Sequence, residues 1–218
     1  IGHSDSDNPA QVTLDTLDNA GFTNAWLGFE RNTLFLSSRI ADELRAGLLR
    51  AEWIDISGMV DDLRRVKSAR ELEYMQQAAA VSDAMFTAAL NTAQAGVSEK
   101  EIAAEVHKAM VLAGGEYPGF APFIRSTPRL GEEHTTWSKR VLQPGDALFL
   151  EMAGCVARYH APIGRLVFVG SAPPGAEKMA ALCIKAAGRV VEAIKPGVTA
   201  AQVYRAWQDC VDEAGLSH

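Results

Sequence analysis

Residues 146–170 decide the fold of this chain: Asp146-Ala-Leu-Phe-Leu-Glu151-Met-Ala-Gly-Cys-Val-Ala-Arg-Tyr159-His160-Ala-Pro162-Ile-Gly-Arg165-Leu-Val-Phe-Val-Gly170. The apolar residues in both halves of this stretch predict two adjoining strands. A carboxylate, a Tyr-His pair and an Arg project from this otherwise apolar sheet. Tyr159 and His160 are expected to point to opposite faces, because successive strand residues alternate.

Composition excludes several classes of protein. The chain has 218 residues, of which 48% are hydrophobic and 22% charged, so one large domain or two smaller ones are expected. The net charge of −6 argues against a nucleic-acid or anionic-membrane partner. No apolar run reaches the ~18–20 residues of a membrane span. The three cysteines are widely spaced and form no CxxC, which disfavours disulfides and structural zinc and favours a cytoplasmic protein.

The remaining periodicities predict a small α/β unit followed by a longer helical segment and the hairpin. Strands are expected at 24–30, 33–36, 53–56 and 120–126. Helices are expected from Asn8-Pro9 and over 38–50, 59–66, 68–94, 176–194 and 200–214, with one more after Ser98.

One motif occurs twice. Gly96-Val97-Ser98-x-x-Glu101 and Gly197-Val198-Thr199-x-x-Gln202 each follow a long predicted helix and each carry a capping-box pattern. Either the chain holds a duplicated helix-helix-sheet unit, or these are two generic capped helices. Under the first interpretation strands follow only the first copy, so the second half of the domain is expected to lie outside this chain.

Three motifs in order resemble the pita-bread family (creatinase, aminopeptidase P, peptidase M24-like). They are Val66-Lys67-Ser68-x-x-Glu71-Leu-Glu73-Tyr-Met, then Gly96-Val97, then Leu142-x-Pro144-Gly145-Asp146. The resemblance implies an α+β fold. Residues 1–57 would be the end of a small α/β N-terminal domain, and residues 58–218 the first half of the catalytic domain.

The peptidases of this family carry two metal-binding Asp residues on the hairpin, the second eleven positions after the first. Glu151 and Pro162 occupy these positions here. Because a proline side chain cannot bind a metal, the resemblance implies a site without metal or other cofactor. The pattern around Glu151, Tyr159, His160 and Arg165 is most similar to the ectoine hydrolases. Gly164 stands where creatinase has an acidic residue, which argues against creatine.

The resemblance also assigns roles to side chains. His134 matches the catalytic His, since an imidazole can accept a proton from water and return it to a leaving nitrogen. Glu151 would complete the catalytic pair by binding a cationic amidine. His160, Tyr159 and Arg165 are expected at the substrate, although Tyr159 and Arg165 could be structural. Arg125 and Arg158 are weaker candidates for a substrate carboxylate. The alternative for His134 is an ordinary histidine of a surface loop, and the alternative for Glu151 is a solvated residue on an edge strand.

The predicted function is metal-independent hydrolysis of a C–N bond in a small amidine, with ectoine as the leading substrate and N-acetyl-2,4-diaminobutyrate as product. The alternatives are an Xaa-Pro dipeptidase or aminopeptidase, a creatinase-like hydrolase, or an inactive binding member of the fold. The resemblance implies a homodimer. It also places a His of the second half of the site near His218.

Overall fold

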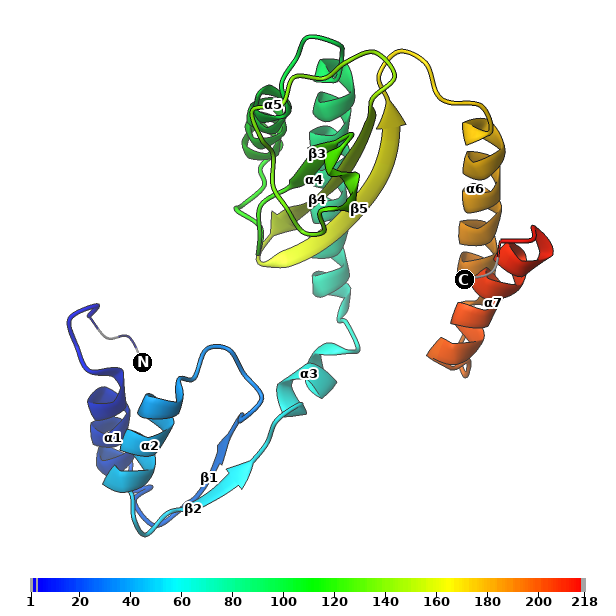
Figure 1. The fold of residues 1–218 in the computed structure, drawn as a ribbon. Helices are drawn as coiled ribbons and strands as arrows, with labels where there is room; N and C mark the ends of the chain where they lie inside the picture. Colours follow the sequence, from blue (N-terminus) through cyan, green and yellow to red (C-terminus); the bar gives the residue numbers. More distant parts are fainter. Residues whose placement is uncertain (1, 3, 217–218) are drawn as a thin grey trace. The chain divides into compact units, whose positions relative to one another are not determined.

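The computed structural model describes Gly2 and residues 4–216 (Figure 1). His218 therefore lies outside the described residues. The chain divides into two compact units, Ile1–Ala69 and Arg70–His218. The sequence-based division falls earlier, after Ser57, and would assign the short helix that follows to the second unit.

The first unit alternates helices and strands: α1 (Pro9–Asn19), β1 (Trp26–Phe29), α2 (Ser38–Gly47), β2 (Glu52–Asp55) and α3 (Met59–Arg64). The Asn8 side chain caps α1 by accepting from the backbone N–H of Ala10, as the Asn-Pro pair predicts. β1 and β2 pair in parallel, with Trp26 opposite Glu52.

The strand expected at 33–36 does not form. A strand needs a hydrogen-bonded neighbour, and no described residue pairs with this segment. Leu34 and Phe35 are 100% and 98% exposed, and Ser37 at once caps α2. The prediction was wrong because the apolar run indicates β-propensity only, and the sequence does not show whether a second strand is available to pair with it.

The second unit contains two long helices and then a sheet: α4 (Ala69–Thr92), α5 (Glu99–Leu112), β3 (Phe123–Ser126), the short 3₁₀ helix η1 (Arg129–Gly131), β4 (Ala147–Val156) and β5 (Tyr159–Phe168). β3, β4 and β5 form an antiparallel sheet in that order. One face of the sheet buries Leu148, Leu150 and Met152 against Val81 and Met85 of α4 and Ile102 and Val106 of α5. This α+β arrangement confirms the predicted fold class.

A close approach fixes the hairpin on α4. A Cβ on Gly154 of β4 would lie 2.2 Å from the backbone oxygen of Ala78, so only glycine fits there. The buried Ser82 hydroxyl accepts from the Gly154 N–H at 2.8 Å and donates to the Ala161 carbonyl of β5. A single helix residue therefore binds both strands of the hairpin.

The last two helices are α6 (Ala176–Ala193) and α7 (Ala200–Glu213), which pack on each other through Ala186 and Cys210 and through an Arg189–Glu213 ion pair. Both predicted capping boxes form, at Ser98 of α5 and at Thr199 of α7. Among the described residues, no helix has the length and apolar character that crossing a membrane requires.

Candidate functional site

The strand register separates the sheet into two faces. Residues opposite one another on paired strands project to the same side. Glu151 lies between Phe123 of β3 and Gly164 of β5, on the face turned away from the α4–α5 core. We call this side the open face, and it carries Phe123, Arg125, Phe149, Glu151, Ala153, His160, Pro162, Gly164 and Leu166.

Glu151 is the one carboxylate among the strand residues of the open face. It is half-buried, and no described residue hydrogen-bonds or ion-pairs with it. An ionised carboxylate in partly apolar surroundings is costly without a partner. Glu151 is therefore suited to bind a cation that approaches this face.

His134 lies beside the same part of the sheet. Its ring centroid is 5.3 Å from that of Phe123, the cross-strand neighbour of Glu151. The ring of Phe120 also stacks on that of Phe123, with 5.2 Å between the two ring centroids. The backbone of His134 has a φ of 51°, a left-handed conformation that is uncommon outside glycine and that often marks functional loops. The structure thus brings His134 next to the neighbour of Glu151.

A buried carboxylate holds the loop that carries His134. Glu99, at the first turn of α5, is fully buried and accepts hydrogen bonds from the N–H and hydroxyl of Ser126 at 2.8 and 2.7 Å. It also accepts from the N–H and hydroxyl of Ser138 at 2.8 and 2.6 Å, and from Arg129 Nη1 at 2.6 Å. Arg129 in turn donates to the carbonyl of Thr136. Both ends of the His134 loop are therefore anchored to one side chain.

Burial alone raises the pKa of Glu99, but the hydrogen bonds from Ser138 and Ser126 outweigh it and lower the pKa below its ordinary value. The carboxylate therefore stays ionised. Sequence reasoning missed this residue, since a Glu after an N-cap Ser is ordinary in a first helical turn. Its partners lie 27 to 39 residues further along the chain, where no local signal marks them.

His160 lies on the open face, but both of its ring nitrogens are engaged. Nε2 accepts from the Gly119 N–H at 3.0 Å, which leaves Nδ1 to donate to the Arg158 carbonyl at 3.0 Å. These bonds select one neutral tautomer. His160 thereby ties the segment that carries Phe120 to β5.

Tyr159 and Arg165 project to the other face of the sheet, opposite Val156 and Leu150. The Tyr159 hydroxyl donates to Glu71 Oε1 at 2.7 Å, and its ring stacks on Tyr74 of α4 at 5.7 Å. Arg165 is exposed and donates to the Gly164 carbonyl. The structure therefore does not place these two predicted substrate residues with Glu151 and His134.

The hairpin does not fit a metal pair. Pro162, opposite Ala153, offers no donor atom, and Glu151 is the one carboxylate among the strand residues of this face. The described part of the chain holds no cluster of three His, Cys, Asp or Glu side chains suited to a metal ion. Burial raises the pKa of the Cys155 thiol, and this disfavours a nucleophilic role for it.

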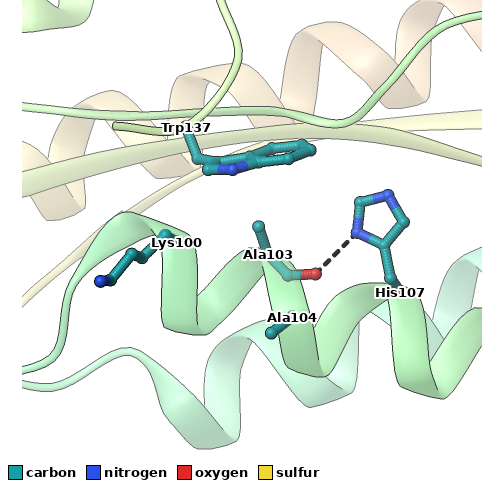
Figure 2. A pocket seen from close by; sticks show the side chains of 5 residues that line it. All are labelled: Lys100, Ala103, Ala104, His107 and Trp137. Carbon is teal, nitrogen blue, oxygen red and sulfur yellow. Dashed lines mark hydrogen bonds between the residues drawn. The ribbon is translucent and has the colours of Figure 1, made fainter. Parts of the chain in front are cut away.

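An open hollow lies elsewhere, along α5 on the helix side of the sheet. Lys100, Ala103, Ala104, His107 and Trp137 line it (Figure 2). His107 Nδ1 contacts the Ala103 carbonyl at 2.7 Å, and its ring meets Trp137 edge-on at 5.3 Å. The hollow contains neither member of the predicted catalytic pair.

Comparisons with known proteins agree with this architecture. The chain is 25% identical to ectoine hydrolase from Halomonas elongata, over 92% of the chain and 52% of that protein. It is 29% identical to Xaa-Pro dipeptidase from Pyrococcus furiosus, over 75% of the chain and 47% of that protein. The chain thus spans about half the length of these curated relatives.

Among solved structures, X-Pro aminopeptidase from Thermotoga maritima superimposes with a TM-score of 0.85 over 94% of this chain and 57% of that one, at 24% identity. This likeness shows the shared fold. The family model of the metallopeptidase family M24 matches residues 73–218, which include most of α4, all of α5, the hairpin and the His134 loop. The chain therefore belongs to the metallopeptidase family M24, as its motifs predict.

Proposed function

We propose that the protein hydrolyses a C–N bond in a small amidine without the help of a metal, and that ectoine is its substrate. The observation that carries this proposal is the open face of the hairpin. It presents one unpartnered carboxylate, Glu151, and has proline at the position where the family's peptidases carry a second one. The relative named ectoine hydrolase supports the choice of substrate.

In the proposed reaction Glu151 binds the protonated amidine through charge-assisted hydrogen bonds. His134 accepts a proton from water, and the resulting hydroxide oxygen forms a bond to the amidinium carbon. The bond from this carbon to one ring nitrogen then breaks with its electron pair going to nitrogen, and His134 returns the proton to that nitrogen. The hydroxyl on the carbon passes its own proton to the freed amine as the carbonyl forms. The ring opens to N-acetyl-2,4-diaminobutyrate.

The amidinium carbon is already electrophilic, which reduces the need for a Lewis acid. General acid–base help from His134 is expected to contribute roughly 10²–10⁴-fold to the rate. The anchored loop that positions His134, and the binding of the amidine by Glu151, supply further acceleration by orienting the reactants.

The test uses the full-length protein after dialysis against a chelator, with its metal content checked by elemental analysis. Ectoine, creatine and an Xaa-Pro dipeptide are incubated separately, and products are followed by NMR. Turnover of ectoine by the metal-depleted protein is expected, and it should be lost in His134→Ala and Glu151→Gln. His107→Ala, on the helix side of the sheet, is the matched control and should remain active.

Xaa-Pro peptidase activity is the second candidate, because a relative at 29% identity bears the name Xaa-Pro dipeptidase. Dipeptide cleavage that disappears with the chelator would replace the ectoine proposal by this one. No turnover of any of the three compounds would point instead to an inactive binding member of the fold.

The resemblance further supports a homodimer in the cytoplasm, which we include in the proposal. In the first unit Phe29 and Trp53 pack edge-to-face at 5.6 Å, while Trp26 is exposed. Light scattering of the full-length protein should give twice the monomer mass. A monomeric mass at micromolar concentration would contradict the dimer.

A further inference from the structure

Arg125 is the second charged residue of the open face. It lies on β3 directly opposite Phe149 of β4 and is 8% exposed. Its guanidinium carbon stands 4.3 Å from the centre of the Phe149 ring. This stacking fixes the plane of the guanidinium.

Two of the three guanidinium nitrogens of Arg125 make no hydrogen bond to a described residue. Its Nε and Nη1 atoms are enclosed, and no partner for them exists among the described residues. An arginine cannot relieve this cost by losing its proton, because it stays charged in proteins. Buried charges are normally paired. The enclosed guanidinium is therefore expected to meet an anion.

The nearest carboxylate of the open face does not fulfil this role. Glu151 stands opposite Phe123, two residues along β3 from Arg125, and the two charges form no ion pair. Diagonal neighbours of this kind are separated by about 7–8 Å. A small molecule with a cationic and an anionic end can span that distance.

We propose that Arg125 binds the carboxylate of the substrate, so that the site selects small zwitterions whose cationic end meets Glu151. The inference rests on the proposed function for the position of the amidine. A planar guanidinium held on an aromatic ring suits the two oxygens of a carboxylate, which can accept parallel hydrogen bonds. Arg125 would then determine both affinity and the orientation of the amidine carbon toward His134.

The test compares acids with matched compounds that lack the carboxylate, in the full-length protein carrying His134→Ala so that nothing is turned over. The first pair is ectoine and 2-methyl-1,4,5,6-tetrahydropyrimidine, the same ring without its carboxylate. The second pair is glycyl-proline and glycyl-prolinamide. Calorimetric titration gives the dissociation constants with Arg125 intact and in Arg125→Gln and Arg125→Lys. Arg70→Gln, an exposed ion-pair arginine of α4, is the control.

We expect the acid of one pair to bind about 10- to 100-fold more tightly than its partner compound, as for a charge-assisted hydrogen bond. Arg125→Gln should abolish this preference, Arg125→Lys should restore part of it, and Arg70→Gln should keep it. Preference within the dipeptide pair alone would support Arg125 and overturn the ectoine proposal.

Three results would overturn the inference. The first is equal binding of acid and partner compound in both pairs. The second is no binding of any of the four compounds. The third is a preference that persists in Arg125→Gln, and a lower melting temperature of that unliganded variant would then show that Arg125 pairs with a carboxylate of the protein itself.

Discussion

Replacing Glu99 by glutamine should destabilise the protein and impair the His134 loop. The carboxylate accepts from Ser126 through one oxygen, and from Ser138 and Arg129 through the other. Glutamine keeps the shape of the side chain but has only one acceptor oxygen. Its amide NH₂ therefore takes the place of the second carboxylate oxygen and faces donors there.

The less costly orientation keeps the oxygen toward Ser138 and Arg129 and loses both bonds from Ser126. The Ser126 hydroxyl, which also accepts from Arg140 Nε at 3.0 Å, would have to turn its proton away from the amide and would lose the acceptor that Glu99 provides. Two bonds to a charged group at ~1.5–3 kcal/mol each give a loss of about 3–6 kcal/mol. Arg129, whose side chain is 20% exposed, keeps Glu132 as its remaining counter-charge. With an m-value in the upper part of the usual range, ~2–3 kcal/mol/M, the urea midpoint should fall by about 1–3 M.

The assay is urea unfolding of the full-length protein followed by tryptophan fluorescence, with Glu105→Gln as control. Glu105 is also on α5, but its side chain is 47% exposed and pairs with Lys108, so its loss should cost only ~0–1 kcal/mol. Because Glu99 positions the His134 loop, the kcat of the Glu99→Gln variant should fall by a larger factor than its KM changes. Equal midpoints for the two variants at pH 7 would refute the reasoning.

The pH dependence gives a second check on Glu99. Its folded-state pKa lies below the ordinary value of 4.5, so its contribution is fully present above pH 4.5 and is lost as the pH falls through the folded pKa. The difference in stability between the unmodified protein and Glu99→Gln should therefore shrink below pH 4.5. A difference that stays constant down to pH 3 would mean that the charge of Glu99 contributes nothing.

Three further substitutions test the packing around the hairpin. Gly154→Ala should lower the melting temperature and cost at least ~1–3 kcal/mol, because the added Cβ meets the backbone of α4; an unchanged melting temperature in a thermal scan would contradict that close approach. Ser82→Ala should cost about 1–3 kcal/mol by leaving the Gly154 N–H unsatisfied, and an amide exchange rate at Gly154 equal to that of the unmodified protein would speak against it. Tyr159→Phe should cost ~0.5–1.5 kcal/mol through the lost bond to Glu71, measured by urea unfolding; a raised KM at unchanged stability would instead show that Tyr159 contacts the substrate.

Much of the fold was predictable because its signals are local. The capping boxes at Ser98 and Thr199 begin α5 and α7 where expected. Long helical periodicity located α4, and alternation in the apolar runs located β4 and β5. The expected strand at 120–126 begins only at Phe123, because Pro122 precedes it and lacks a backbone donor.

The faces of the site were harder to predict, because they depend on the register of the hairpin. The turn consists of Ala157 and Arg158 at φ values of 49° and 64°, conformations that asparagine or glycine usually supply. Without that signal the sequence does not reveal that Glu151 stands opposite Gly164. A displacement of one residue would bring Arg165 to the open face. Arg165 was expected beside the substrate from the family resemblance alone, which carries no information on this register.

Charge partners that are distant in sequence were the other obstacle. Arg125 was only a weak candidate, because nothing in its neighbourhood indicates that β3 is buried along its length. Its burial results from packing against β4, whose Phe149 lies 24 positions further along the chain.

The two-sided nature of β5 has a consequence for how such proteins can diverge. Pro162 and Gly164 lie away from the α4–α5 core, and a Cβ at Gly164 would meet nothing within 4 Å. A side chain at Gly164 would therefore clash with none of the described residues. Most substitutions must first be tolerated by the fold before selection can act on their chemistry. This strand is thus a natural place to begin laboratory evolution toward other substrates.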